Sequence, residues 1–332
     1  MEKKRSLIFA LLFAALFLVS ACKPEEVITN SSEDEKGPET PVGPVQPAEP
    51  DPMTVCTFNI RNANNTDKYS DGSSAAWSDR REAVKKFVDT VKPDLIGLQE
   101  IRKVQAEDFA SFFGSDYGYY DVGRDSKTGA SVASANCEGV GILFRKDRFE
   151  LVKMGFFWLD ENFGVLPEKN SDGTYGAWNS ACRRVTVYVE LKDKQHGNTP
   201  VYFFTTHYDH KSAVARRNAA DLSVSQIKAL CKVSTLKEAD PVILHVGDLN
   251  ATYISGQLQS LNDNMYYARL AVDGPDRSKG TYNGFGKSDT LIDHIYYGGK
   301  SIKPVRYWVD RTDYGVPFLS DHYPVLFQWE YR

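Results

Sequence analysis

Six largely apolar segments of this chain share one feature, which is that each leads into a carboxylate, an amide or an imidazole. The segments are residues 54–58, 94–98, 201–205, 242–246, 290–292 and 318–319, and they lead in turn to Asn59, Glu100, His207, Asp248, Asp293 and His322. Many of these runs are apolar at consecutive positions, which is typical of strands that are buried on both faces. Because a buried charge is costly unless it is paired or binds a metal, the economical interpretation is one common site at the strand ends.

The rest of the pattern predicts further strands with helices inserted between them. Runs rich in β-branched and aromatic residues predict strands at residues 54–60, 94–99, 139–144, 184–191, 201–206, 242–246, 291–297 and 323–329. One helix is predicted after Ser78, a suitable N-cap, and ends before Pro93, and a longer amphipathic helix is predicted over residues 213–236. Strands that outnumber helices indicate sheets packed on each other and covered by helices. A doubly wound nucleotide-binding fold is the alternative, but the turn after the first strand, residues 59–62, is not glycine-rich.

The N-terminus has the three parts of a secretory signal peptide. Basic side chains at residues 3–5 precede an uncharged apolar stretch at residues 7–19, which is too short to span about 30 Å of hydrocarbon comfortably. The next residues, Ser20-Ala21-Cys22, resemble the lipobox of bacterial lipoproteins. The resemblance implies that residues 1–21 are removed and that Cys22 carries a lipid. Ordinary cleavage, which would leave Cys22 as a free thiol, is the alternative.

Residues 22–52 are rich in Pro, Glu, Ser and Thr and cannot bury enough apolar surface to fold, so they are predicted to be a disordered spacer. The expected location is a bacterial membrane, with the protein facing the periplasm or the cell surface. Lys23-Pro24-Glu25-Glu26 resembles the acidic signals of some surface-exposed lipoproteins of Gram-negative bacteria, which favours the outer membrane.

Residues 53–332 are predicted to form one domain, which we expect to be monomeric. A hydrophobic content of 42% and an aromatic content of 12% suffice for a sizeable core. The formal net charge of −4 becomes −6 once residues 1–21, with three basic side chains and one acidic, are removed. This balance argues against a generic nucleic-acid coat protein, which would need a basic face.

Four cysteines follow Cys22, and none has the spacing of a zinc site. Cys56 lies in a strand pattern and Cys231 in a helical one, where buried free thiols are common. Cys137 and Cys182 lie in polar loops of an exported protein, so a disulfide between them is expected.

Oxygen ligands from Asp, Glu and Asn suit a hard cation, Mg²⁺ or Mn²⁺. Magnesium usually keeps waters and substrate phosphate oxygens in its shell, so few protein ligands are required. The histidines would then supply proton transfer and charge stabilisation near neutral pH.

The strand-end motifs, in this order, resemble those of the endonuclease/exonuclease/phosphatase superfamily. They are Phe58-Asn59-Ile60-Arg61, Ile96-Gly97-Leu98-Gln99-Glu100, Thr206-His207-Tyr208-Asp209-His210, Gly247-Asp248-Leu249-Asn250, Ile292-Asp293-His294-Ile295 and Ser320-Asp321-His322-Tyr323-Pro324. The resemblance spans nearly all of residues 53–332. It implies a DNase I-like fold, which is a four-layer α/β sandwich of two mixed sheets with the site at the edge where these strands end.

The resemblance also assigns roles to the matching residues. Asn59 and Glu100 match the metal-binding pair, and Asp321 is a further possible ligand. His322 matches the histidine that contacts the scissile phosphate and activates water, and Asp293 matches the carboxylate that orients it.

For the remaining matched positions, His207 is expected to be a donor to the phosphorane or an acid to the leaving oxygen, and Asp248 and Asn250 are expected to position water and phosphate. Either Asp248 or His322 is the base, and one metal or two are compatible with the motifs.

Substrate-binding residues are expected in the loops that rim the site. Arg124 and Arg183 could meet phosphate, and Trp178 lies in the same region. Glu138 precedes a central strand, where the family has an acidic residue. Tyr282 could stack on a base or a sugar, although a packed aromatic loop is the favoured interpretation.

The function expected from these motifs is divalent-metal-dependent hydrolysis of a phosphoester, favouring a phosphodiester, by water that a His–Asp pair activates outside the cytoplasm. The substrate would be a nucleic acid, a phospholipid or a small organic phosphate. The alternatives are a phosphomonoesterase of lipid or sugar phosphates and a catalytically inactive binding lipoprotein on the same fold. The second alternative is disfavoured because every motif residue is present.

Overall fold

The computed structural model describes residues 52–332, to which all structural statements below refer. The predicted signal peptide, the lipidated Cys22 and all but the last residue of the spacer lie outside the described residues and stay predictions. Within residues 52–332, none of the helices has the length and apolar character that a membrane crossing requires.

The described chain forms two six-stranded sheets, with strand orders β11-β12-β1-β2-β4-β3 and β5-β6-β7-β8-β10-β9. The strands are β1 Met53–Asn59, β2 Leu95–Ile101, β3 Tyr117–Gly123, β4 Gly139–Arg145, β5 Phe149–Trp158, β6 Val185–Asp193, β7 Thr199–His207, β8 Val242–Asp248, β9 Tyr266–Tyr267, β10 Asp293–Gly298, β11 Ile302–Val309 and β12 Val325–Tyr331. The helices are α1 Trp77–Val91, α2 Lys103–Phe113, α3 Val132–Ala135, α4 Ala213–Cys231, α5 Gln259–Asn264, α6 Ala268–Ala271 and the 3₁₀ turn Pro275–Ser278.

Both sheets are mixed, and each has one parallel pair among its central strands. In the first sheet β1 and β2 are parallel, and in the second β7 and β8 are parallel. Parallel neighbours need a crossover connection, which α1 supplies between β1 and β2 and α4 supplies between β7 and β8. The two parallel pairs contact each other across the sandwich. The strand ends that carry the polar motifs therefore meet at one edge.

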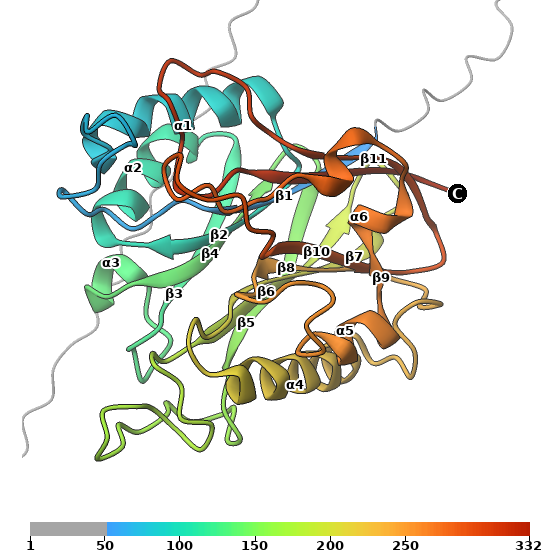
Figure 1. The fold of residues 1–332 in the computed structure, drawn as a ribbon. Coiled ribbons are helices and arrows are strands. Elements are labelled where there is room, and N and C mark those ends of the chain that lie inside the picture. The colour runs from blue at the N-terminus through green and yellow to red at the C-terminus, as the bar shows by residue number, and fades with distance from the viewer. Residues whose placement is uncertain (1–51) are drawn as a thin grey trace, which may run out of the picture. The chain divides into compact units, whose positions relative to one another are not determined.

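Three apolar layers hold the sandwich together. One core lies between the sheets and includes Val55, Phe203 and Val246, all fully buried. A second core joins the first sheet to α1 and α2, and a third joins the second sheet to α4 and α5. Figure 1 shows these helices on the two outer faces of the paired sheets. The order of layers is helix, sheet, sheet, helix, which confirms the expected four-layer architecture.

The eight predicted strands are all present, with ends that differ by at most two residues. The strands that the sequence pattern missed are β3, β5, β9 and β11, and each lies at an edge of its sheet. The first predicted helix begins at Trp77, one residue before Ser78. The second ends at Cys231 rather than 236, because Lys232 adopts a left-handed conformation with a φ of 56° and donates its N–H back to the last turn.

The expected disulfide between Cys137 and Cys182 is wrong, since all four described cysteines are free thiols. The sulfur of Cys137 is buried against Gly123, whose missing side chain leaves room for it. Cys182 instead lines an open cleft, described below. Cys56 and Cys231 are buried free thiols, as expected.

Two histidines in the core make stability depend on pH. Burial lowers the pKa of His245 to about 3 and that of His294 to about 4. Below pH 6.5 the unfolded chain protonates both imidazoles while the folded chain does not, so each lowers the unfolding free energy by about 1.4 kcal/mol per pH unit until its folded pKa is reached. This contribution is absent above pH 6.5, where both states are neutral.

We therefore expect these two histidines to lower the unfolding free energy as the pH falls from 6.5 to 5, and His245→Gln to remove about one proton from the pH dependence of the unfolding free energy. Urea unfolding at a series of pH values measures how steeply the unfolding free energy changes with pH. His196, whose ring stacks on Tyr331 outside the apolar cores, provides the matched control, and His196→Gln should leave the slope unchanged. An unaltered slope in His245→Gln would contradict the assignment.

Candidate active site

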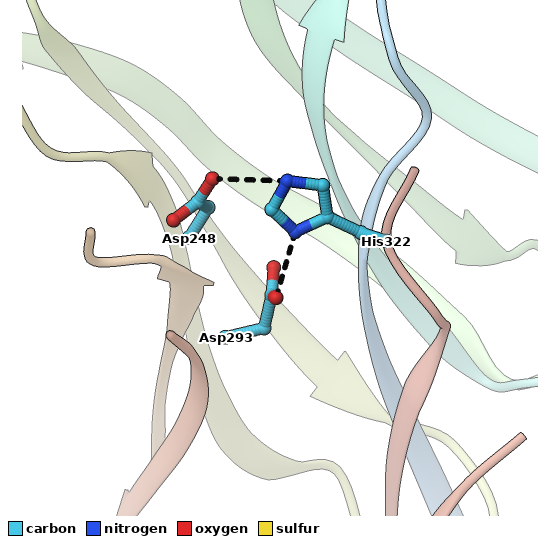
Figure 2. A group of neighbouring side chains, drawn as sticks. All are labelled: Asp248, Asp293 and His322. Atoms are coloured by element: carbon cyan, nitrogen blue, oxygen red, sulfur yellow. Dashed lines mark hydrogen bonds and ion pairs between the residues drawn. The ribbon is translucent and has the colours of Figure 1, made fainter. Parts of the chain in front are cut away.

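A histidine between two carboxylates lies at the edge where the motif-bearing strands end. The Nδ1 atom of His322 is 2.8 Å from Oδ2 of Asp293, and its Nε2 atom is 3.6 Å from Oδ2 of Asp248. Figure 2 shows the imidazole held by the two carboxylates. All three side chains are buried. Asp248 ends β8 and Asp293 begins β10, where the two residues are antiparallel partners, and His322 lies in the loop before β12.

The two carboxylates favour the protonated imidazole. Burial alone would lower the pKa of His322, but the charges of Asp293 and Asp248 raise it to about 10. Burial, helped by the charge of Asp293, raises the pKa of Asp248 to about 7. At neutral pH the imidazolium is therefore a donor, and Asp248 is the group that can exchange a proton.

A row of three residues crosses the second sheet at the same level. His207 is the parallel partner of Asp248 in β7, and Asp293 is its antiparallel partner in β10. The Nε2 atom of His207 is 3.4 Å from Oδ2 of Asp248. Burial, followed by the positive charges of Arg184 and Arg124, lowers the pKa of His207 well below its ordinary value. His207 is therefore neutral.

Asn250 follows this row and faces the same cleft. Its backbone N–H donates to Oδ1 of Asp248 at 3.0 Å, and its side-chain amide donates to the carbonyl of Tyr208 at 3.1 Å. The backbone of Asn250 is left-handed, with a φ of 49°, a conformation that asparagine tolerates better than most residues.

The first sheet contributes Asn59 and Glu100. The amide nitrogen of Asn59 donates to Oδ2 of Asp248 at 3.0 Å and to Oε1 of Glu100 at 3.2 Å. The amide oxygen of Asn59 accepts the backbone N–H of Arg61 at 3.0 Å. This orientation favours Asn59 as a donor that links the two sheets, whereas its predicted role as a metal ligand stays a prediction.

Glu100 is aimed into the cleft by an irregularity in its strand. The pairing of β2 with β4 shifts between Gln99 and Ile101, and Glu100 between them has a φ of 63°. Such a backbone costs on the order of 1 kcal/mol or more and persists when the surroundings enforce it. Burial would raise the pKa of Glu100, but the positive charges of Arg61 and His322 hold it below its ordinary value.

The donor set fits a hard divalent cation. Glu100 and Asp321 face the same cleft, where Nη1 of Arg61 lies 3.8 Å from Glu100 and 3.9 Å from Asp321. Asp248, Asp293 and His322 place one possible ligand atom each within 4.8 Å of one another. The Oδ1 atom of Asp293 is buried without a hydrogen-bond partner. So many buried carboxylates need further positive charge, and oxygen donors are the ligands that Mg²⁺ and Mn²⁺ prefer.

A cleft of about 480 Å³ opens over these groups. Among the predicted substrate-binding residues, Arg124 and Glu138 line it and form an ion pair with each other. Tyr282 also lines it, with its ring centroid 4.9 Å from that of His322.

Trp178 and Arg183 are not among the residues that line this cleft, although Arg183 lines a small pocket beside it with Arg184 and His207. Their role in substrate binding stays a prediction. Trp178 packs against the core beneath α4. The guanidinium of Arg183 donates to the carbonyl of Pro167 and to Asp125 and lies over the ring of Tyr175. Arg61, Arg184 and His210 are among the cleft residues that were not predicted as site residues. Nothing in the sequence distinguishes Arg184 from the adjacent Arg183, because both precede the same strand.

The model of the endonuclease/exonuclease/phosphatase family matches residues 56–322. No curated protein sequence matches the chain.

Solved structures match closely in fold. An endonuclease/exonuclease/phosphatase from Bacteroides vulgatus is 26% identical with a TM-score of 0.69, over 85% of this chain and 100% of that one. The mannosyl-6-phosphatase of Bacteroides thetaiotaomicron is 26% identical with a TM-score of 0.68, over 83% of this chain and 99% of that one. The human Nocturnin catalytic domain with bound sulfate anion is 15% identical with a TM-score of 0.63, over 86% of this chain and 96% of that one, a likeness of fold alone.

Proposed function

Because the chain belongs to the endonuclease/exonuclease/phosphatase family, we propose that it is a phosphoester hydrolase that depends on a divalent metal, Mg²⁺ or Mn²⁺. The observation that carries the proposal is the buried row His207–Asp248–Asp293 beneath an open cleft, with His322 held between the two carboxylates of the row. The likeness to a mannosyl-6-phosphatase supports a phosphorylated sugar among the candidate substrates. Action outside the cytoplasm rests on the predicted leader and Cys22.

The metal would be held by the carboxylates of Glu100 and Asp321, which line the cleft with Asn59 beside them. When bound, it supplies a Lewis acid that offsets charge developing on the phosphoryl oxygens. We assign the catalytic proton transfers to the groups of the second sheet.

The protonation states of three side chains determine the role of each in the reaction. Asp248, with a pKa of about 7, accepts the proton of the attacking water. Protonated His322, fixed through its Nδ1 atom by Asp293, donates from Nε2 to a phosphoryl oxygen. Neutral His207 donates a hydrogen bond to the leaving oxygen. This arrangement assigns the base to Asp248 rather than to His322.

The experiment is a hydrolysis assay on the purified protein with p-nitrophenyl phosphate and bis(p-nitrophenyl) phosphate. We expect Mg²⁺ or Mn²⁺ to be required, so that chelation lowers the rate at least about 100-fold and metal restores it. His322→Ala serves as the blank. His196→Ala is the matched control, because His196 stacks on Tyr331 and does not line the cleft. If neither chelation nor His322→Ala changes the hydrolysis rate, the proposal is wrong and the inactive binding protein is the better interpretation.

A further inference from the structure

Arg184 presents an unsatisfied cation to the cleft. Its side chain lies immediately before β6, and the residue is only 6% exposed. One Nη atom lies 3.1 Å from Nδ1 of His210, whereas Nε is buried without a hydrogen-bond partner. Within residues 52–332, no carboxylate oxygen comes within the 4.0 Å of an ion pair with this guanidinium. Burying an unpaired cation costs free energy unless a ligand supplies a hydrogen-bond acceptor or an opposite charge.

The carboxylates whose charge reaches Arg184 are already engaged. Asp209 accepts backbone N–H groups at both of its oxygens, from the two loops 181–182 and 211–212. Glu138 pairs with Arg124 through one oxygen and lies 3.9 Å from Arg102 through the other. Neither is placed to turn toward Arg184 without giving up partners of its own.

The positive charge of Arg184 also affects the pKa values of two neighbouring histidines. After burial, the charge of Arg184 is the largest cause that lowers the pKa of His207 and of His210. The unsatisfied cation therefore lies beside the histidine that faces the leaving oxygen, on the second sheet. Glu100 and Asp321, the carboxylates suited to a metal, approach the cleft from the side of the first sheet.

We propose that Arg184 binds a non-bridging oxygen of a terminal phosphate, so that the substrate of this site is a phosphomonoester. A diester phosphate has one negative charge and two non-bridging oxygens, which a metal and His322 already occupy. A monoester has three such oxygens and a charge of about −1.5 to −2 at pH 7. The third oxygen needs its own donor, and the guanidinium fork of Arg184 suits it. The inference rests on the proposed function and replaces the diester preferred from the sequence.

Hydrolysis of the phosphomonoester needs no co-reactant other than water. The water oxygen forms a bond to phosphorus while the bond between phosphorus and the ester oxygen breaks, and the proton of the water passes to Asp248. The alcohol leaves with its oxygen protonated by solvent, and orthophosphate remains, held by Arg184 until it dissociates.

Two substrates with the same leaving group test the proposal, p-nitrophenyl phosphate and bis(p-nitrophenyl) phosphate, each with Mg²⁺. The wild type should have a kcat/KM at least tenfold higher for the monoester. Arg184→Met should lose about 100-fold on the monoester and less than about fivefold on the diester, because a charge-assisted bond is removed from one substrate only. Arg184→Lys should retain part of the difference in kcat/KM between the monoester and the diester. Arg306→Met, at an arginine of β11 whose guanidinium lies over the ring of Trp308 and does not line the cleft, should leave the ratio unchanged.

The outcomes separate the two proposals. A wild type that prefers the diester overturns the monoester assignment and leaves the proposed function standing, and this comparison does not depend on any variant folding. An equal loss on both substrates in Arg184→Met, with unfolding midpoints matching the wild type, also overturns it and reduces Arg184 to a structural role. Hydrolysis of neither substrate by the wild type overturns the proposed function itself. Competitive inhibition by orthophosphate that weakens at least tenfold in Arg184→Met supports the assignment independently of the leaving group.

Discussion

Asp293→Asn should lower kcat for phosphoester hydrolysis by about four orders of magnitude and leave KM within a few-fold. The carboxylate of Asp293 lies 2.8 Å from Nδ1 of His322 and is only 1% exposed, so its charge acts on the imidazole with little screening. An amide of the same shape keeps the packing but removes the charge that holds His322 protonated with Nε2 toward the cleft. The loss therefore belongs to the transition state rather than to substrate binding.

Steady-state kinetics at saturating metal check this expectation. Asp273→Asn is the matched control, because the side chain of Asp273 is 97% exposed and pairs only with Arg277 on the surface. Combining Asp293→Asn with His322→Ala should add little beyond either single change, since the two residues act as a unit. Losses that multiply in the double variant would contradict the coupling.

Gly247→Ala should abolish activity and lower the unfolding free energy by about 3 kcal/mol or more. A Cβ atom on Gly247 would stand 2.1 Å from the carbonyl oxygen of Thr206, its parallel partner in β7. The obstacle is backbone rather than a flexible side chain, so β7 and β8 would have to separate at the level where His207 and Asp248 meet. A displacement of this kind moves the catalytic groups as well as straining the sheet.

Urea unfolding and the hydrolysis assay measure the two effects on the same preparation. Gly274→Ala is the control, because a Cβ atom at that position meets nothing within 4 Å. Wild-type stability in Gly247→Ala would show that the strands can yield at this point and would contradict the expectation.

The sequence pattern predicted the interior strands and missed the edges for a physical reason. Strands such as β1 and β8 are buried along their whole length, so apolar side chains stand at consecutive positions. Five of the ten residues of β5 and three of the eight residues of β11 are exposed, because nothing in the sheet covers an edge strand on its outer side. Their residues therefore carry no continuous apolar signal. β3 is interrupted by glycine and β9 has two residues.

The row His207–Asp248–Asp293 was predictable because its residues occupy the ends of buried strands, and the strand order of the sheet fixes their neighbours. The orientation of Trp178 and Arg183 was not predictable, because they lie in the loop between β5 and β6, which has no periodicity to reveal where a side chain points. The path of that loop is set by buried carboxylates, with Asp160 accepting the N–H groups of residues 177–178 and Asp209 those of residues 181–182. Contacts of this kind between distant segments leave no local trace in the sequence.

The hydrogen bonds that cross between the two sheets have a consequence for partly folded states. Asn59 in β1 reaches Asp248 in β8, and Gln99 in β2 reaches Thr205 in β7 at 2.9 Å. Each sheet carries only some of the proposed catalytic groups, so we expect neither sheet to be competent alone. A loosened state in which both sheets survive but slide over one another would retain its far-ultraviolet circular dichroism and lose its enzymatic activity. Turnover in this protein is therefore a more sensitive indicator of native tertiary packing than secondary structure is.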